Sequence, residues 1–284
     1  MLVQKKKLLK TIIIFALCFI LFITYIFLIE PNRLEKTYLI IETDRFPENS
    51  PPIKIIHLTD FHIDKIGWRE KRVLKILASE EPDLIFLSGD YLNRKDKLKE
   101  LTEYIRSISD IAPIYFTLGN WDTLATQEAV IKGGGVSVFE KKLKVHPVPG
   151  NNFEFNIFSI KYNWAYIGES NEKRRLDELL KDLDKEYFTI FLAHTPDHFP
   201  FAIEHDIDLM LAGHTHGGQF RLPFFGSFYT DSKFGKKYEK GYFKERNTIL
   251  YVNRGIGMTG NIKFRVRSFC SPEILIITLK SKKK

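Results

Sequence analysis

The chain has 284 residues, of which 44% are hydrophobic and 27% are charged, the composition of an ordinary globular enzyme. Its two cysteines, Cys18 inside an apolar run and Cys270 near the C-terminus, exclude an intramolecular disulfide. A net charge of +8 is compatible with anionic partners such as a membrane surface, a phosphorylated substrate or nucleic acid, although a solvated basic surface explains the charge as well.

The first predicted element is a transmembrane helix over Thr11–Ile29, a run without a charged residue. At ~1.5 Å rise per residue this helix spans roughly 28 Å, close to the ~30 Å hydrocarbon core of a bilayer. It also lacks a polar face. The main rival is a cleavable signal peptide, which usually has a shorter apolar region, of ~7–15 residues, that ends at small residues. The run therefore predicts a retained single-pass anchor in the cell membrane, preceded by a basic segment over residues 1–10.

The orientation of this anchor follows from the basic residues on its two sides. The cluster Lys5–Lys10 precedes the anchor, whereas the basic residues between Arg33 and Arg45 lie further from it and among acids. Because positive residues favour the cytoplasm, we expect the catalytic domain on the non-cytoplasmic side of the membrane. The cytoplasmic face remains the alternative.

Residues 30–52 are predicted to form a connector with one strand at Thr37–Glu42, residues 53–279 to form one domain, and residues 280–284 to form a basic tail. Within the domain, apolar runs predict strands at Lys54–Thr59, Leu84–Ser88, Ile114–Leu118, Phe153–Ile160, Trp164–Ile167, Phe188–Leu192, Leu209–Ala212, Ile249–Val252 and Glu273–Leu279. Helical spacing of apolar residues predicts helices at Arg69–Glu80, Asp96–Ser109 and Lys173–Leu183. This alternation is typical of the α/β class with a largely parallel sheet, here expected as two sheets.

Polar residues capable of chemistry directly follow five of these apolar runs. They are Asp60 and His62, Gly89-Asp90, Gly119-Asn120-Trp121-Asp122, His194, and Gly213-His214-Thr215-His216-Gly217-Gly218. In open α/β sheets, ligands bind beyond the carboxyl ends of the strands. The five segments are therefore expected to converge on one site.

The residue types and their spacing indicate a metal site. Residues two apart in an extended segment point the same way, so Asp60 and His62 can address one ion, and His214 and His216 can face one site. Carboxylate, amide oxygen and imidazole suit Mn²⁺, Fe or Zn²⁺ rather than a thiolate-selected metal. A two-metal site needs a bridging group, for which Asp90 is the candidate. The remaining histidines lie outside the pattern and are predicted to be structural or on the surface: His57, His146, His198 and His205.

Each motif alone is weak, but the ordered set D-x-H, G-D, G-N-x-D, H and G-H-T-H resembles the calcineurin-like metallophosphoesterases, over about Ile53 to Leu279. Three longer phrases, at residues 212–219, 251–257 and 271–274, resemble a membrane-anchored bacterial branch similar to UDP-2,3-diacylglucosamine diphosphatases of the lipid A pathway. The resemblance implies a double β-sandwich flanked by helices and two divalent ions, with Mn²⁺ the first expectation. It also implies that one ion is held by Asp60, His62 and His216, the other by Asn120, His194 and His214, and that Asp90 bridges them.

One residue departs from the family pattern, because the usual G-N-H-D/E is Gly119-Asn120-Trp121-Asp122 here. The family histidine lies by the scissile phosphate, and an indole offers one N–H donor and a stacking face but no acid. Arg254 or another donor is expected to take over part of this role. The candidate catalytic residues are therefore Asn120, Asp122 and Arg254, and the candidate substrate-binding residues are Trp121 and Arg254.

Together these features predict hydrolysis of a phosphoester or pyrophosphate bond, with UDP-2,3-diacylglucosamine of lipid A biosynthesis as an example of a membrane-associated substrate. The expected partners are the bilayer and a phosphorylated or nucleotide-linked lipid, and no protein partner is inferred. One alternative is a nuclease or soluble-substrate phosphodiesterase, which the absence of a Lys/Arg cluster beside the motifs disfavours. Another is a catalytically weakened, membrane-tethered binding module.

Overall fold

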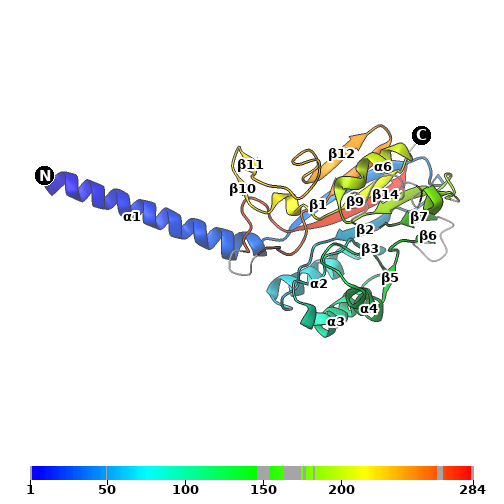
Figure 1. Ribbon diagram of the computed structural model, residues 1–284, viewed down its shortest axis with the longest axis horizontal. Coiled ribbons are helices and arrows are strands. Elements are labelled where there is room, and N and C mark those ends of the chain that lie inside the picture. The colour runs from blue at the N-terminus through cyan, green and yellow to red at the C-terminus, as the bar shows by residue number, and fades with distance from the viewer. Residues whose placement is uncertain are drawn as a thin grey trace.

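The computed structural model describes residues 2–48, 50–145, 154–160, 162, 174, 177–181, 183–260 and 265–282. Two six-stranded sheets lie face to face, and helices cover their outer faces (Figure 1). This arrangement confirms the predicted double β-sandwich flanked by helices.

The first sheet contains the strands that lead into three of the five motifs. Its order is β1 (Glu35–Thr43), β14 (Glu273–Ser281), β2 (Ile53–Leu58), β3 (Leu84–Leu87), β4 (Ile114–Phe116) and β5 (Gly135–Ser137). Strands β2 to β5 are parallel, whereas β14 is antiparallel to β2. The connecting helices are α2 (Trp68–Glu80), α3 (Leu98–Ser109) and α4 (Leu124–Lys132). Their apolar faces pack on this sheet and form one buried cluster with Ile56, Leu58, Ile85 and Leu87.

The second sheet leads into the other two motifs. Its order is β12 (Gly241–Glu245), β13 (Thr248–Val252), β9 (Leu209–Ala212), β8 (Phe188–Leu192), β7 (Phe155–Phe158) and β6 (Lys142–Val145). Strands β7, β8, β9 and β13 are parallel. The short helix α6 (Phe199–Glu204) packs on the outer face, while Phe86 and Ile190 contribute to the cluster buried between the two sheets. Both sheets thus direct their motif-bearing strand ends toward the same region.

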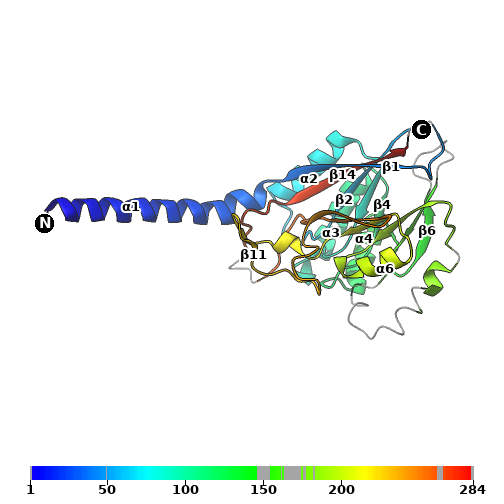
Figure 2. The same cartoon turned by 90° about the horizontal axis from the view of Figure 1, so that it is seen from above.

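The N-terminal helix projects from the domain in both views (Figures 1 and 2). Helix α1 (Leu2–Thr24) continues into a π-helical turn, η1 (Tyr25–Ile29), and a 3₁₀ turn, η2 (Glu30–Asn32). The stretch Gln4–Asn32 is long and apolar enough to cross a membrane. Its C-terminal end is part of the domain, because Ile26 and Glu30 are buried.

Three predicted boundaries differ from the structure. The connector predicted over residues 30–52 contains β1, which is hydrogen-bonded along its length to β14 and so belongs to the first sheet. The basic segment over residues 1–10 is helical from residue 2 onward and continuous with the apolar run. The C-terminal tail also starts later, since β14 extends to Ser281.

Most strands and helices in the described part of the chain match the prediction within one to three residues. The strand predicted at Trp164–Ile167 and His146 lie outside the described residues, as does much of the helix predicted at Lys173–Leu183. The helices α4 and α6 were not predicted, and neither were the strands β5, β6, β12, β10 (Arg221–Leu222) and β11 (Gly226–Ser227), of which the last two form a small hairpin.

Candidate metal centre

The loops that follow β2, β3, β4, β8 and β9 meet at one edge of the sandwich, as the five apolar runs predict. They place side chains in two groups whose ligand atoms lie within 4.8 Å of one another. The first group is Asp60, His62 and His216, and the second is Asp90, His194 and His214. All six are buried except His214, which is partly exposed.

The first group presents two imidazoles and one carboxylate oxygen to a common point. The Nε2 atoms of His62 and His216 are 3.2 Å apart, and Nε2 of His216 is 3.5 Å from Oδ1 of Asp60. The other carboxylate oxygen, Oδ2, accepts hydrogen bonds from the Thr59 hydroxyl (2.9 Å) and the His214 backbone N–H (3.0 Å). Among the described residues, Oδ1 has no hydrogen-bond partner although it is buried. A buried carboxylate oxygen without a partner is costly unless a cation occupies its surroundings.

The second group adds an amide oxygen. Nε2 of His194 lies 3.2 Å from Nδ1 of His214 and 2.9 Å from Oδ1 of Asn120. The other ring nitrogen of His194 donates to the Ser88 carbonyl at 2.7 Å, which fixes the tautomer that leaves Nε2 unprotonated in the neutral ring. Asn120 therefore lies where the resemblance implies a ligand.

Asp90 lies between the two groups. Its Oδ2 is 3.4 Å from Nε2 of His62 and 3.4 Å from Nε2 of His194. Two donors about 3.2 Å apart can both reach one ion at a metal–nitrogen distance of ~2.1 Å. The donor set and the unpaired oxygen of Asp60 thus fit two divalent cations with a shared carboxylate.

The backbone at the site is left-handed at several residues, which differs from the extended conformation of a strand. Five site residues have positive φ: Asp60 (50°), His62 (43°), Asp90 (56°), His214 (68°) and His216 (51°). The prediction that each pair lies on an extended segment was therefore wrong. Asp60 and His62 still reach the same group, but His214 and His216 belong to different groups.

Glycines allow the close approach of the loops. A Cβ atom on Gly119 would lie 2.2 Å from Oδ1 of Asp90, and one on Gly213 would lie 2.3 Å from Oδ2 of Asp60. Both distances are well inside van der Waals contact, so a side chain at either position would displace a carboxylate of the site.

Burial and nearby charge shift the ionisation of the site. Burial alone would lower the pKa of His194, but the carboxylates of Asp90 and Asp60 raise it to about 10. Burial raises the pKa of Asp122, the Asp90 carboxylate adds to this effect, and three backbone N–H donors oppose it. The carboxylates of the site therefore favour the binding of positive charge beside them.

The side chains of Asp122 and Arg254 make contacts that the sequence did not predict. The Asp122 carboxylate accepts backbone N–H groups of Asp90 (2.7 Å), Tyr91 (3.1 Å) and Gly119 (2.8 Å), so it positions two motif loops. The Arg254 guanidinium is paired with Glu273 (3.1 Å) and Glu35 (3.0 Å) and does not line the cavity at the site. Neither side chain lines the cavity at the metal centre, and a catalytic role for either stays a prediction.

Trp121, in contrast, lies at the mouth of the site. Its ring is 42% exposed and meets the His62 ring edge to face, with centroids 5.5 Å apart. Its backbone N–H donates to Oδ1 of Asp90 at 2.9 Å. The indole thus lines a cavity of about 360 Å³ above both ligand groups.

Sequence reasoning missed several residues of this site. The cavity wall also contains Gln219, Phe220, Phe228, Tyr229, Asp231 and Thr259. Asn93 orients His62, because its Oδ1 is 3.0 Å from Nδ1 of His62 and its Nδ2 donates to the His62 carbonyl at 2.7 Å. The sequence offered one indication of this role, because Asn93 lies only three residues after Asp90 of the Gly89-Asp90 motif.

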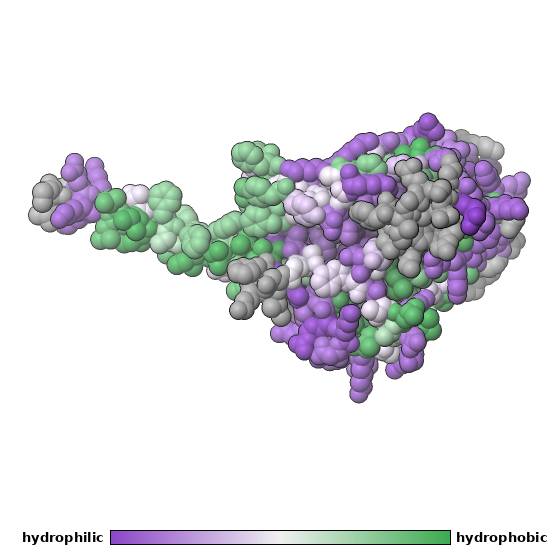
Figure 3. Space-filling model, viewed as in Figure 1, coloured by the Kyte–Doolittle hydropathy of each residue, from purple (hydrophilic) through white to green (hydrophobic). Residues whose placement is uncertain are grey.

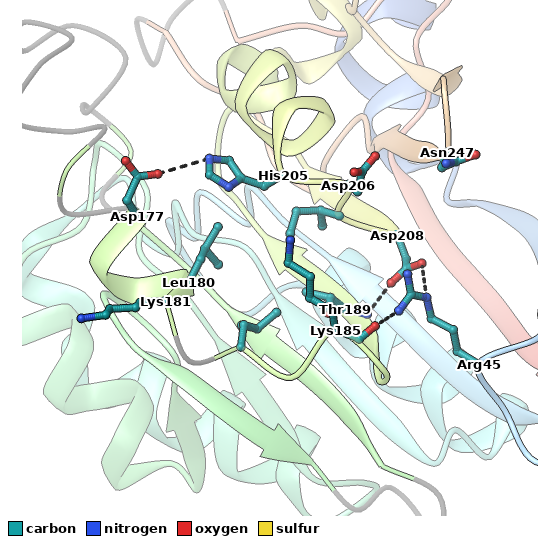
Figure 4. A pocket seen from close by; sticks show the side chains of 12 residues that line it. Arg45, Asp177, Leu180, Lys181, Lys185, Thr189, His205, Asp206, Asp208 and Asn247 are labelled. Carbon is teal, nitrogen blue, oxygen red and sulfur yellow. Dashed lines mark hydrogen bonds and ion pairs between the residues drawn. The ribbon is translucent and has the colours of Figure 1, made fainter.

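A second cavity, of about 490 Å³, lies elsewhere in the molecule (Figure 4). Two pairs of side chains interact across it: Arg45 with Asp208 at 3.0 Å, and His205 with Asp177 at 3.5 Å. It contains neither ligand group, so volume alone does not identify the functional site.

The histidines outside the pattern remain outside both groups, within the described residues. His57 is buried and hydrogen-bonded to Ser88 at 2.8 Å, and burial lowers its pKa to about 3. His198 is also buried, and burial lowers its pKa to about 4. Both are neutral core residues at physiological pH.

Comparison with known proteins gives consistent relatives. The profile of the calcineurin-like phosphoesterase family matches residues 53–218. The metallophosphoesterase YkuE of Bacillus subtilis (strain 168) is 29% identical over 262 residues, which cover 89% of this chain and 88% of YkuE. Phosphodiesterase YaeI of Escherichia coli (strain K12) is 28% identical over 246 residues, or 82% of this chain and 84% of YaeI.

Two further proteins extend the comparison. UDP-2,3-diacylglucosamine pyrophosphatase LpxG of Chlamydia muridarum (strain MoPn / Nigg) is 23% identical over 303 residues, covering 88% of this chain and 90% of LpxG. The crystal structure of TT1561 of Thermus thermophilus superposes with a TM-score of 0.52 at 15% identity, covering 73% of this chain and 92% of that chain. The structural likeness shows a common fold.

Proposed function

Because this chain belongs to the calcineurin-like phosphoesterase family, we propose that it hydrolyses a phosphoester or pyrophosphate bond in a lipid held in the membrane. Metal-dependent phosphoesterase activity follows from the family and from the two ligand groups. The lipid nature of the substrate is the new part of this proposal. The observation that carries it is the cavity at the metal centre, whose lining includes the aromatic residues Phe220, Phe228 and Tyr229. These residues flank β10 and β11, which lie at the end of the domain from which α1 projects (Figure 1).

The seven predicted ligands would hold the two ions. Asp60, His62 and His216 would bind one, Asn120, His194 and His214 the other, and Asp90 would contact both. When bound, the ions supply water activation at neutral pH and stabilise negative charge on the phosphoryl oxygens. Among the metals that this donor set accepts, Mn²⁺ is our proposal.

The protein's own groups orient the substrate. Trp121 replaces the family histidine, and its half-exposed ring offers a stacking face and one N–H donor but no proton for the leaving group. Loss of a general acid typically lowers a rate 10²–10⁴-fold unless the leaving group is good. A nucleoside monophosphate leaving from a pyrophosphate is a good leaving group, and its base provides a ring on which Trp121 can stack.

The relative LpxG is named for such a substrate, since UDP-2,3-diacylglucosamine joins a nucleotide to a lipid through a pyrophosphate. We take this compound as the representative of the substrate class: an anionic phosphate or pyrophosphate group attached to acyl chains that remain in the bilayer.

The helix α1 is proposed to be a retained single-pass anchor. A signal peptide is removed without consequence for the mature fold, whereas here Glu30 is buried and accepts a hydrogen bond from Ser271 at 3.0 Å. The Lys5–Lys10 cluster supports a domain on the non-cytoplasmic side. A C-terminal reporter that is active only in the cytoplasm would contradict this orientation.

The test is one activity panel with the full-length protein in lipid vesicles and Mn²⁺. The substrates are UDP-2,3-diacylglucosamine, a single-stranded oligonucleotide and a soluble aryl phosphodiester. We expect the highest kcat/KM on the lipid. Preference for the oligonucleotide would instead identify a nuclease. If no substrate were turned over, the remaining interpretation would be a membrane-tethered binding module without catalysis.

A further inference from the structure

The hairpin of β10 and β11 exposes a cluster of aromatic side chains. Its tip is Leu222-Pro223-Phe224-Phe225-Gly226, where Phe224 is fully exposed and Phe225 is 80% exposed. Phe228 and Tyr229, which follow directly, are 67% and 72% exposed. We call these four aromatic residues the hairpin patch. Such a contiguous apolar surface marks an interaction site rather than an ordinary solvated loop.

The backbone at the tip reinforces this interpretation. Phe224 has φ of 68°, a left-handed conformation that is rare for a bulky residue. This conformation projects two adjacent phenylalanine rings away from the domain. Within the described residues no side chain covers them, so a partner that covers them must lie outside the domain.

The hairpin is fixed beside the end of the anchor by a short series of contacts. The Arg221 backbone N–H donates to the Ser268 carbonyl at 2.9 Å. One residue further on, the Phe269 ring packs on the Tyr25 ring with centroids 5.5 Å apart. On the other side of Ser268, the Arg267 backbone N–H donates to the Ile26 carbonyl at 3.2 Å. The hairpin and the anchor therefore contact the same segment of chain.

The figures show the consequence of these contacts. In both ribbon views β10 and β11 lie at the end of the domain from which α1 projects (Figures 1 and 2). On the surface, the hydrophobic colour of the anchor continues onto this adjoining edge of the domain (Figure 3). A bilayer that surrounds the apolar part of α1 would therefore meet the hairpin.

The patch is also continuous with the metal centre. Phe228 and Tyr229 line the cavity together with His214 and His216. These aromatic rings thus belong both to the wall of the cavity at the metal centre and to the exposed hairpin patch.

We propose that the hairpin patch inserts into the bilayer beside α1 and holds the mouth of the cavity at the lipid surface. This inference deepens the proposed function and rests on α1 being a retained anchor. The phosphate of a lipid substrate would enter the metal centre while its acyl chains stay in the membrane. The occupant of the patch is thus lipid, and not a second protein chain.

The direct test uses full-length protein in phosphatidylcholine–phosphatidylglycerol vesicles, in a Cys18→Ser background. An environment-sensitive fluorophore is attached at Phe225→Cys, or at Ile131→Cys as the control, because Ile131 is an exposed apolar residue on α4, away from the anchor. We expect a lipid-borne nitroxide to quench the label at 225 and aqueous iodide to quench the label at 131. Iodide quenching of both labels would overturn the insertion, and shielding of 225 from both quenchers would assign the patch to a protein partner instead.

A kinetic test separates insertion from catalysis. Phe224→Ser combined with Phe225→Ser should lower kcat/KM on a lipid-phase phosphodiester by about tenfold, equivalent to the ~1.4 kcal/mol that corresponds to a factor of ten. The soluble aryl phosphodiester should be hydrolysed at an unchanged rate, since neither residue lines the cavity. The control Ile131→Ser should change neither rate. An equal fall on both substrates would overturn the proposal, whereas a wild-type protein inactive on every substrate would refute the function and leave the label test to decide insertion.

Discussion

The carboxylate of Asp60 is held by only one of its two oxygens. Thr59 and the His214 backbone bond to Oδ2, and the left-handed backbone at Asp60 turns Oδ1 toward His216. Left-handed conformations of non-glycine residues cost about 1–3 kcal/mol each and persist where surrounding contacts over-determine them. Five such residues at one site indicate that the site's neighbours, and not the ligands' own preferences, set its geometry.

The first prediction compares the loss of Asn93, which orients a predicted metal ligand, with the loss of Asp90, which is itself a predicted ligand. Asn93→Ala should lower metal affinity or activity by about 10–100-fold, the usual effect of removing a partner that orients a metal-bound histidine. Excess Mn²⁺ should restore much of the activity, because the ligands themselves remain. Asp90→Ala should abolish activity and reduce metal in both positions, and excess Mn²⁺ should not rescue it. Elemental analysis that finds two equivalents of metal in Asp90→Ala would contradict the shared carboxylate.

Replacement of Trp121 tests whether the indole binds the substrate or merely marks the loss of the family histidine. If its ring stacks on the nucleotide base, Trp121→His should impair hydrolysis of the UDP-linked lipid, since such stacking is worth about 1–3 kcal/mol per base. The same change should improve hydrolysis of the aryl phosphodiester by restoring an acid. The measurement is kcat/KM on both substrates, and a parallel rise on both would show that the indole has no role in binding.

At the scale of elements, a buried polar cluster joins η2 to the domain; we call this contact the joint. The Glu30 carboxylate is 1% exposed and accepts hydrogen bonds from Tyr25 (2.7 Å) and Ser271 (3.0 Å). Glu30→Ala should lower the free energy of unfolding by about 1–3 kcal/mol, because it leaves the buried Ser271 hydroxyl without this partner. The control is Glu42→Ala, which removes a surface ion pair with Lys280 worth at most about 1 kcal/mol. Equal melting temperatures of the two variants in detergent would argue against a stabilising role for the joint.

The start of β14 predicts acid sensitivity. Burial raises the pKa of Glu273, but the Arg254 charge and hydrogen bonds from Thr37 and Tyr251 outweigh it, so the pKa is lowered. A carboxyl with a lowered folded-state pKa stabilises the fold above its unfolded-state pKa, about 4.3, and this contribution is lost as the pH falls through the folded-state value.

Replacement of this carboxyl should therefore change how the free energy of unfolding depends on pH between pH 7 and pH 3. Glu273→Gln should reduce the free energy of unfolding at pH 7 by about 1.5–3 kcal/mol, the range for hydrogen bonds to charged groups. The difference between the variant and the wild type should shrink as the pH falls below ~4.3 and disappear only below the lowered folded-state pKa of Glu273, where both proteins are uncharged at this position. Melting temperatures between pH 7 and pH 3 that stay parallel would contradict the assignment.

The elements that the sequence predicts well are those with a strong local signal. Strands β8 and β9 have the predicted bounds, because each is a short apolar run buried on both faces. Helix α4 was missed because Gly133, Gly134 and Gly135 follow it closely and its apolar spacing is short. Strand β12 was missed because its half-exposed alternation of polar and aromatic residues resembles a loop.

At the site, too, some features could be predicted from the sequence and others could not. The order of the motifs predicted which residues meet, since the carboxyl ends of neighbouring strands share an edge. It could not predict how they meet, because left-handed backbone at Asp60 and His216 depends on contacts made by other segments. The ion pairs of Arg254 could not be predicted for a related reason: its partners, Glu35 and Glu273, lie 219 and 19 residues away in sequence.

For the whole molecule, removal of metal should affect both activity and stability. A chelator should abolish hydrolysis of the aryl phosphodiester and lower the melting temperature, because ions that bind only the folded state stabilise it by about 2.7 kcal/mol at a free concentration 100 times Kd. Mn²⁺ should restore both properties. A melting temperature indifferent to the chelator would show that the ligand groups do not hold metal tightly.

If α1 anchors the chain and the substrate is a lipid, as we propose, the packing of the end of this helix against the domain would set the kinetic regime of the enzyme. Without a flexible tether between Asn32 and β1, the active site would stay at one height over the leaflet and remain with one vesicle through many turnovers. Its rate on a lipid then depends on the mole fraction of that lipid in the surface, since surface confinement fixes the effective concentration. Diluting vesicles of fixed composition leaves such a rate unchanged, whereas diluting a soluble substrate lowers it. The proposed anchor would thereby convert a three-dimensional search for substrate into a two-dimensional one.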